Sequence, residues 1–448
     1  MRGTENIGRF EGKQKGRKTE SMSELLEMIL SDENVLPAMY KVIENRGAGG
    51  IDGITTRELE KYYNEHWEGI KEEIRNRTYK PQPVLRVEIP KKSGGVRKLG
   101  IPTVNDRTIE QAIVQILAPI FEEHFSEYSY GFRAGRSCEQ AIRQLLEYFE
   151  DGATWIVDID LEKFFDNVPQ DKLMSYVGRV IHDGDTESLI RKYLKAGIMN
   201  RGKYEETNLG TPQGGNLSPL LSNIMLNELD KELEKRGLRF TRYADDCVIV
   251  VGSEASAKRV MASITEWIER KLGLKVNMTK TQITRPPKVK YLGYSFWYDT
   301  KEKKWKARPH ESSVQEFRRK LKKLCKRSWS ISMDDRVKKI NALTRGWVNY
   351  YAFGNMKSKM AETDEHLRTM IRMVIWKQWK VPSRREWGLK KLGVDKDLAR
   401  LTSYCGNRYY WVVTKTCVVR AISKDILKRR GLVSIYDYYM ERHALKVG

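Results

Sequence analysis

Acidic and apolar side chains alternate along a short run from Trp155 to Asp166, and this run constrains the fold more than any other part of the chain. Its apolar side chains recur at every second position, the period that places them on one face of a β-strand. Asp158 and Asp160 then lie on the other face of the same strand. The pattern therefore predicts a strand that presents carboxylates on one side of a sheet.

A second acidic run lies further along the chain, from Phe240 to Val250. Its centre, Tyr243-Ala-Asp-Asp246, separates two β-rich segments, as a tight turn between two strands would. A strand face and a hairpin turn can bring carboxylates from distant parts of a sequence into one small volume. Mg²⁺ prefers such oxygen ligands together with substrate phosphates, and two ions stabilise both the attacking and the leaving oxygen of a phosphoryl transfer. Each run alone is equally compatible with solvent-facing strand residues or ordinary turn formers.

The charge balance indicates a polyanionic partner. Lys and Arg number 82 against 59 Asp and Glu, which gives a net charge of +23 and a pI near 9.6. Surface cations in such excess attract polyphosphates and release their counterions. The 11 Trp and 22 Tyr side chains offer flat faces for unpaired bases. Nucleic acid is favoured over the alternative of a merely soluble basic protein.

The cysteines and the apolar segments indicate the compartment. The five cysteines are scattered, without a C-x-x-C pair or a Cys/His cluster, so we expect neither a disulfide framework nor a structural zinc. No apolar run approaches the length that spans a membrane, and the first 20 residues are basic without the apolar stretch of a secretory signal. We expect a cytoplasmic protein that associates with the nucleoid, without a membrane partner.

Periodicity and breaker residues divide the chain into elements. A Gly-Gly turn between Val84–Pro90 and Val96–Pro102 predicts a hairpin. The character changes near Arg308-Pro309, where a helical and cationic region begins, and a smaller mixed segment follows Pro382. Helices are predicted over Ser23–Asn45, Thr55–Asn76, Asp106–Phe125, Ser137–Glu150, Asp171–Lys195, from the loop at Gly210–Gly215 to about Lys235, Ala255–Leu272 and Glu311–Trp379.

The ordered set of motifs resembles one known family. Tyr243-Ala-Asp-Asp246 is similar to the hallmark tetrapeptide of reverse transcriptases, and the whole set resembles group II intron-encoded reverse transcriptase/maturases over about Leu25 to the C-terminus. The motifs follow one another in the family's order. They are Gly50–Gly53, Val87–Pro102, Ser129–Arg133, the acidic strand, Gly210–Pro219, Tyr243–Asp246, Asn277–Thr281 and Tyr291–Tyr294.

The resemblance implies an α+β fold of the right-hand polymerase type. Fingers and palm, with an antiparallel palm sheet and helices, would precede an α-helical thumb and maturase (X) domain. The expected segments are a flexible basic tail over 1–22, fingers and palm over 23–308, the thumb and maturase domain over 309–381, and a short DNA-binding-like segment over 382–448.

The resemblance also assigns the metal ligands. Asp160 and Asp245 would be the principal ligands of two Mg²⁺ ions, with Asp246 as the third carboxylate and Mn²⁺ as a substitute ion. The backbone carbonyl of Leu161 would reach a metal as well. Asp158 fits the strand pattern equally well, and only the family register sets it aside. Asp166 is expected to be structural, as a helix N-cap or an arginine partner.

Five residues are expected to contact the incoming nucleotide. Lys91 and Arg97 flank a turn that could fold over the triphosphate, although a solvated basic hairpin explains them too. By the resemblance, Phe165 closes against the sugar and excludes a 2′-hydroxyl, and the alternation of an extended segment would leave Phe164 in the core. Gln213 would bond nucleotide or template from a glycine-rich loop, and Lys280 would lie near the leaving pyrophosphate unless it is simply solvated.

Further residues are expected at the primer, the template and the intron RNA. Tyr291 and Gly293 resemble the turn that holds the primer end, although core packing also explains the aromatic rings. A helical and cationic surface would contact RNA phosphates, although most such charge runs are only solvated helix faces. The cations proposed for RNA contact are Arg318, Arg319, Lys322, Lys323 and Arg345.

The resemblance implies an RNA-directed DNA polymerase that also assists its own intron in splicing and retrohoming. Its partners would be intron RNA, an RNA template with a DNA primer, target DNA and dNTPs, in a bacterial cell. Two alternatives remain: a splicing cofactor without polymerase activity, and a host-adopted or defence-associated reverse transcriptase. The chain lacks the paired cysteines of the His-Asn-His endonuclease found in longer family members, so we expect the primer to come from elsewhere.

Overall fold

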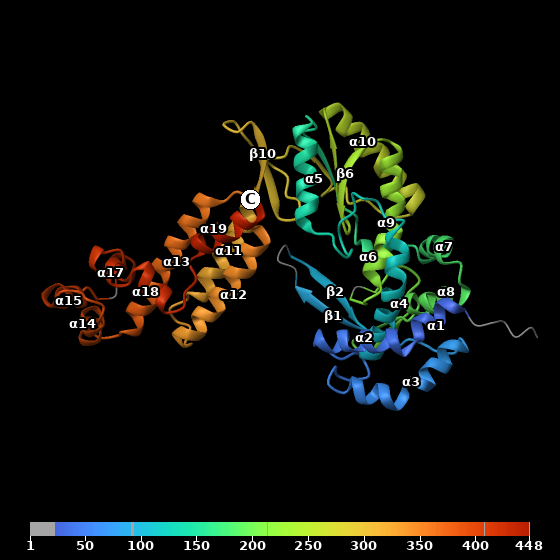
Figure 1. Ribbon diagram of the computed structural model, residues 1–448, viewed down its shortest axis with the longest axis horizontal. Coiled ribbons are helices and arrows are strands. Elements are labelled where there is room, and N and C mark those ends of the chain that lie inside the picture. The colour runs from blue at the N-terminus through green and yellow to red at the C-terminus, as the bar shows by residue number, and fades with distance from the viewer. Residues whose placement is uncertain (1–22, 91–93, 213, 407, 448) are drawn as a thin grey trace, which may run out of the picture. The chain divides into compact units, whose positions relative to one another are not determined.

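The computed structural model describes residues 23–90, 94–212, 214–406 and 408–447 (Figure 1). The chain forms two folding units. The first unit contains residues up to Phe125, Glu162–Glu228 and Lys271–Lys275. The second contains Ser126–Leu161, Leu229–Arg270 and Val276 onward. The fold is α+β, with mostly antiparallel strand pairs and a helical C-terminal region, as the sequence predicted.

A sheet of order β2-β1-β4-β5 organises the first unit. The predicted hairpin is present as β1 (Val84–Pro90) and β2 (Val96–Ile101), whose antiparallel register pairs Arg86 with Gly100. β1 runs parallel to β4 (Ile198–Asn200), which pairs with β5 (Lys203–Glu205). The register places alternate residues of the hairpin on the face that borders the cavity described below.

The helices of the first unit begin and end at capping residues, and two predicted helices are each divided into two. Ser31, with its extended backbone, separates α1 (Glu24–Leu30) from α2 (Asp32–Glu44). His182 at φ 48° ends α7 (Gln170–Ile181), and Asp183 caps α8 (Gly184–Leu194) through its side chain. The remaining helices are α3 (Leu59–Arg75), α4 (Val104–Glu122), α6 (Phe164–Asn167) and α9 (Ser218–Lys235), the last of which continues into the second unit.

A sheet of order β6-β7-β3-β8 carries the acidic runs in the second unit. β3 (Trp155–Ile159) pairs antiparallel with β7 (Asp246–Val251), and β6 (Arg239–Tyr243) lies on the other side of β7. β8 (Gln282–Thr284) completes the sheet. Two helices pack on this sheet: α5 (Cys138–Glu150) contacts β6, beside which Figure 1 shows it, and α10 (Glu254–Trp267) contacts β3, β7 and β8.

After β8, the elements that the structure describes in the second unit are a hairpin and then helices. β9 (Tyr294–Asp299) and β10 (Lys304–Pro309) pair antiparallel, and α11 (Glu311–Leu324) begins directly after them. We predicted a mixed segment beyond Pro382, but every element that the structure describes there is a helix, so that prediction is wrong. The helices are α12 (Met333–Tyr351), α13 (Lys357–Gln378), α14 (Pro382–Lys391), α15 (Lys396–Ser403), α16 (Tyr409–Val413), α17 (Thr416–Ala421), α18 (Lys424–Arg429) and α19 (Ile435–Val447).

Candidate active site

The register of β3 against β7 brings the acidic residues of the second unit together. Ile159 pairs with Cys247, and Asp158 pairs with Val248, so Asp158 lies on the same sheet face as the even-numbered residues of β7. Asp160 follows β3 by one residue, on the side where β7 begins at Asp246. Side chains that face each other across an antiparallel pair have Cβ atoms about 4.5–5.5 Å apart. The two acidic runs therefore meet at one end of the sheet.

A two-residue turn holds Asp245. Tyr243 pairs with Asp246, which leaves Ala244 and Asp245 as the connection between β6 and β7. Ala244 has a φ of 57°, a conformation at the first turn position that two-residue hairpins use and that is unusual for a side chain other than glycine. A Cβ atom built on Gly131 would lie 2.2 Å from the Ala244 nitrogen, so only glycine fits behind this turn.

A buried ion pair supports the same turn from the interior. Arg242 and Asp230 are both fully buried, and two parallel bonds of 2.7 and 2.5 Å join the guanidinium to the carboxylate. The remaining Nη1 of Arg242 donates to the Ala244 carbonyl oxygen at 2.9 Å. The backbone of Arg242 also bonds Tyr128 and Tyr130. One side chain thus fixes both the carbonyl of the turn and the helix α9 that carries Asp230.

The segment Asn277–Thr281 surrounds Asp160. The Asn277 N–H donates to the Asp160 carbonyl oxygen at 2.8 Å, and the Asp160 N–H donates to the Thr281 hydroxyl at 3.1 Å. Lys280 places its ammonium 3.4 Å from both carboxylate oxygens of Asp160. Lys280 therefore lies at the acidic cluster, where it partly balances a carboxylate.

Desolvation, and to a lesser extent mutual repulsion, raises the pKa values of two carboxylates in this cluster. Asp246 is exposed, yet the protein around it desolvates its carboxyl and raises the pKa to about 6. The charges of Asp245, Asp158 and Asp160 add to this rise. Burial also raises the pKa of Asp158, against a hydrogen bond from Gln282 that lowers it. Negative charge concentrated in this way favours a bound cation.

The described residues contain no group of three His, Cys, Asp or Glu side chains already arranged as a metal cage. Asp160 is paired with Lys280 instead. The donor chemistry still fits hard divalent ions, because Mg²⁺ takes one or two protein carboxylates and completes its shell with water and substrate phosphates. Asp158 belongs to the same acidic group, and it is the member of the group that the family pattern sets aside.

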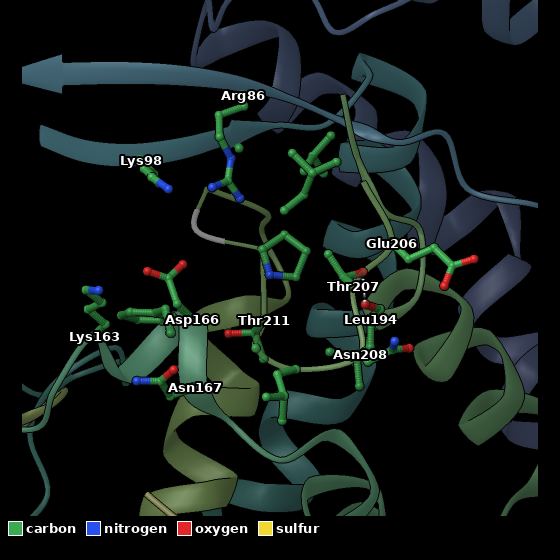
Figure 2. A pocket seen from close by; sticks show the side chains of 17 residues that line it. Arg86, Lys98, Lys163, Asp166, Asn167, Leu194, Glu206, Thr207, Asn208 and Thr211 are labelled. Carbon is green, nitrogen blue, oxygen red and sulfur yellow. Dashed lines mark hydrogen bonds between the residues drawn. The ribbon is translucent and has the colours of Figure 1, made fainter. Parts of the chain in front are cut away.

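A cavity of about 480 Å³ opens in the first unit beside the β1–β2 hairpin. Figure 2 shows Arg86 and Lys98 reaching toward it from the hairpin, with Asp166 on the side of α6. The Nε atom of Arg86 is buried and has no hydrogen-bond partner among the described residues. An unsatisfied guanidinium nitrogen beside a second cation suits an anionic ligand.

Sequence reasoning selected the neighbouring cation on this hairpin and missed these two. Arg97 is exposed and does not line the cavity. Lys98 and Arg86 share one face, because Arg86 pairs with Gly100, two residues beyond Lys98. Strand alternation across the hairpin, Val84–Pro90 against Val96–Ile101, is the signal that could have identified them. Lys91, at the tip, lies outside the described residues.

Phe164 and Phe165 separate as the sequence suggested, but for a different reason. Phe164 is 2% exposed, whereas Phe165 lines the cavity. The segment is the short helix α6 and not an extended strand, so the helical turn directs the two rings apart, with centroids 5.2 Å from each other. The expectation that Asp166 caps a helix is wrong, because Lys163 holds the N-cap and Asp166 lies inside α6.

Three residues of the glycine-rich loop, Gly210, Thr211 and Pro212, line the cavity. Gly210 has a φ of 86°, and a Cβ atom there would lie 2.6 Å from the Phe165 carbonyl oxygen. The Gly210 and Thr211 N–H groups donate to the carbonyls of Val168 and Phe165. The loop backbone is therefore tied to α6. Gln213 lies outside the described residues.

The predicted primer turn is a tight β-turn above a buried ring. Leu292 and Gly293 have φ values of 49° and 80°, and Tyr291 and Tyr294 exchange backbone hydrogen bonds around them. Tyr291 is 2% exposed and its hydroxyl donates to the Thr241 carbonyl oxygen, so packing accounts for this ring. A Cβ atom on Gly293 would lie 2.3 Å from the Tyr351 hydroxyl.

The cations of α11 fall on two different faces. Arg318 and Lys322 line one groove, at positions 318 and 322, whereas Lys323 lines a cavity on another side of the helix. Arg318 pairs with Glu362 and Arg319 with Glu316, so both guanidinium groups are already partly neutralised. Arg345 is exposed on α12. Within the described residues no helix is long and apolar enough to span a membrane.

Comparison with known proteins places this architecture in a family. Residues 89–296 match the model for reverse transcriptase (RNA-dependent DNA polymerase), and residues 314–393 match the maturase-specific domain of group II introns. The first match contains both acidic runs, and the second covers α11 to α14 almost entirely.

Three curated proteins illustrate the similarity. Protein YkfC of Escherichia coli is 34% identical over 58% of this chain and 78% of its own length. The putative COX1/OXI3 intron 2 protein of Saccharomyces cerevisiae is 30% identical, over 65% of this chain and 41% of its own length. The group II intron-encoded protein LtrA of Lactococcus lactis is 38% identical, over 51% of this chain and 38% of its own length. The chain thus spans about two fifths of the last two relatives. From the two domain matches and these relatives, the chain belongs to the group II intron reverse transcriptase/maturase family.

Proposed function

We propose that the protein is an RNA-directed DNA polymerase encoded by a group II intron, which copies intron RNA into cDNA. The observation that carries this proposal is the meeting of the two acidic runs, through the β3–β7 register and the Ala244–Asp245 turn. The strands β3, β6 and β7 and the segment Asn277–Thr281 hold this group in place. An acidic cluster on rigid strands is what nucleotidyl transfer needs, because its catalysis is mostly positioning and charge stabilisation.

Asp160, Asp245 and Asp246 would hold two Mg²⁺ ions, which Mn²⁺ could replace, with the backbone carbonyl of Leu161 as a further ligand. When bound, such ions activate a primer hydroxyl and neutralise the charge that develops on phosphate. The residues around them act by placement. Arg242 fixes the turn, and Asn277 and Thr281 fix the backbone of Asp160. Lys280 supplies a positive charge, and we propose that it faces the leaving pyrophosphate.

The cavity of the first unit would bind the deoxynucleoside triphosphate. Arg86 and Lys98 offer cations to the phosphates, and Arg86 has the unpaired nitrogen. The ring of Phe165 in this cavity would occupy the space that a 2′-hydroxyl requires, and thereby select deoxynucleotides. Arg97, which lies outside the cavity, would support the same nucleotide, and so would the glycine-rich loop around Thr211, which lines it. The roles foreseen for Lys91 and Gln213 remain predictions.

The maturase-specific segment would bind the intron RNA that the polymerase copies. Its cations suit phosphate contacts, since shape and phosphate dominate RNA recognition. We propose that this binding also assists splicing, and that residues 382–448 contact target DNA during retrohoming. The Tyr291–Tyr294 turn would support the primer end. We propose that the protein acts in a bacterial cytoplasm, at the nucleoid, and its similarity to proteins of two bacteria supports a bacterial setting.

Asp245→Asn tests the polymerase assignment. The change removes one negative charge from the metal site with little change in shape, so Mg²⁺-dependent primer extension on an RNA template should fall to background. Affinity for intron RNA should change by less than about threefold, because the phosphate contacts lie elsewhere. Asp334→Asn, an exposed aspartate at the start of α12, is the matched control and should keep both activities. Equal loss of cDNA synthesis and of RNA affinity would refute the assignment.

A further inference from the structure

The cavity that Lys323 lines, between α11, α12 and the segment that connects them, is distinct from the acidic cluster, from the cavity of the first unit and from the groove of Arg318. Its volume is about 700 Å³. Lys320, Lys323 and Leu324 line it from α11, and Lys339 and Leu343 from α12. The connecting segment contributes Lys326, Ser328 and Trp329. All of these residues belong to the second unit.

The rim of this lysine pocket carries uncompensated positive charge. Within the described residues, none of its four ammonium groups has a carboxylate at ion-pair distance, and no acidic residue lines the cavity. The groove on the other side of α11 is different, because Glu362 and Glu316 pair with its Arg318 and Arg319. The lysine pocket is therefore complementary to an anion, and the described part of the chain does not provide that anion.

The wall of the pocket is apolar. Leu324 and Leu343 are partly buried there, and Trp329 is a large aromatic residue that keeps 36% of its surface exposed. A lysine rim around an indole and two leucines offers a ligand a flat apolar surface and several phosphate contacts at once. A free phosphate would use only the lysines, and an apolar ligand only the wall.

A buried arginine holds the connecting segment in shape. Arg336 of α12 is 1% exposed, and its guanidinium donates to the carbonyls of Leu324, Lys326 and Trp329. The same guanidinium lies 5.6 Å from the centre of the Trp329 ring. These hydrogen bonds fix the segment that carries the indole, so the fold itself determines the shape of the pocket.

We propose that this lysine pocket binds an unpaired nucleotide of a single-stranded RNA segment, with the base against Trp329 and the neighbouring phosphates at the lysines. The inference rests on the proposed function, since that function supplies the RNA. Proteins that bind single-stranded RNA commonly stack unpaired bases on aromatic rings and place cations along the phosphate backbone. A duplex hides its bases in the stack and cannot use the indole in this way.

Photo-crosslinking of the full-length protein tests the base contact. The probe is an unstructured oligoribonucleotide of about ten nucleotides that carries one 5-iodouridine. Irradiation should attach it to the peptide that contains Trp329, as mass spectrometry would show. Trp329→Ala should abolish that crosslink and weaken binding about tenfold, and Trp329→Phe should retain most of the binding. A crosslink pattern unchanged by Trp329→Ala would overturn the proposal.

Two competitors separate RNA from other anions. The same oligonucleotide annealed to its complement should crosslink weakly at Trp329, whereas equal crosslinking would mean that only charge is recognised and would overturn the proposal. Oligoglutamate of the same charge should compete poorly. If it displaces the probe as well as unlabelled single-stranded RNA does, the pocket is an acidic-peptide site and the proposal fails.

A pair of lysine variants tests the phosphate contacts. Lys323→Gln with Lys339→Gln should reduce the salt dependence of oligonucleotide binding by about 0.7 in log–log slope for each phosphate that is no longer neutralised. Lys338→Gln with Lys377→Gln removes the same charge from exposed positions outside the pocket and is the control. Equal slopes in the two variants would overturn the proposal. Primer extension by the wild type is measured in parallel, and its absence would refute the polymerase assignment without affecting the pocket result.

Discussion

A single buried side chain sets the position of the turn that carries Asp245. Arg242 satisfies Asp230 with two bonds and uses a third donor for the Ala244 carbonyl oxygen. Lysine has a point charge and cannot reproduce this planar fork. The need for an arginine at position 242 is therefore structural, and it differs from the role proposed for the acidic residues Asp245 and Asp246.

Arg242→Gln should both unfold and inactivate the protein, because it leaves Asp230 buried and unpaired at a cost of about 3–5 kcal/mol. The double variant Arg242→Met with Asp230→Leu removes both charges and should regain much of the stability. It cannot donate to Ala244, so cDNA synthesis should stay about tenfold low, with a higher half-saturating Mg²⁺ concentration. Thermal melting and primer extension across Mg²⁺ concentrations measure the two effects. Recovery of activity together with stability would show that the pair serves folding only.

Phe165→Ala should admit ribonucleotides into the cavity of the first unit. Removing the ring opens the space beside the sugar, so the preference for dNTPs over rNTPs should fall about tenfold or more. Competition between the two substrates in primer extension measures this ratio. Leu209→Ala truncates another side chain of the same cavity and should leave the ratio unchanged. An unaltered ratio in Phe165→Ala would remove the ring from the sugar site.

Residue identity was more predictable from sequence than the side of an element on which a residue lies. The acidic runs were selected for their carboxylates at strand and turn spacing, and Phe165 was selected by its resemblance to the family position. Arg97 was chosen over Arg86 and Lys98 because the register of a hairpin, which decides the face, depends on pairing partners that a single strand does not specify.

At the scale of elements, a buried carboxyl of α4 anchors the start of α9. Glu110 is 4% exposed and accepts a 2.6 Å bond from the Asn216 N–H, next to the glycine-rich loop. Burial raises its pKa from 4.5 to about 8, and the charge of Asp106 adds to the rise. The helix that bears Asp230 thus begins on a group that folding keeps protonated near neutral pH.

The melting temperature should fall as the pH rises from about 5 to about 8. In this window the folded protein binds more protons at Glu110 than the unfolded chain does, so stability decreases with pH. Glu110→Gln should flatten this dependence, because the amide keeps an acceptor oxygen and does not titrate. Differential scanning calorimetry over the pH range measures it, with the exposed Glu123→Gln as the control. The same slope in Glu110→Gln and the wild type would contradict the assignment.

Long helices were predicted from periodicity, but their interruptions were not. Apolar residues recur at helical spacing on both sides of Ser31 and of Asp183, so each pair of helices was predicted as one. The helices after Pro382 were missed for a related reason, since they are short and gain stability from tertiary packing more than from propensity. Tyr439 of α19 is an example of such packing, because it is fully buried and its hydroxyl forms hydrogen bonds with the backbone of Met356 and Gly354.

For the whole molecule, the net charge of +23 matters only where cations are free to meet RNA. The sequence grouped Arg318, Arg319, Lys322 and Lys323 as one RNA-binding surface. The structure separates them by pairing: Glu362 and Glu316 already neutralise the two arginines. Within the described residues, the two lysines have no acidic partner at ion-pair distance. Counterion release should therefore come mainly from the lysines.

Lys322→Gln with Lys323→Gln should reduce the salt dependence of intron RNA binding by up to about 0.9 in log–log slope for each phosphate left without its cation. Arg318→Gln with Arg319→Gln removes the same formal charge and should reduce it less, because the carboxylates that it frees were already compensating the arginines. Filter binding from low to high salt measures both slopes, and melting curves show that each variant is folded. If the arginine variant showed the greater reduction, RNA would have to displace Glu316 and Glu362 on binding, and charge pairing in the free protein would be no guide to its RNA surface.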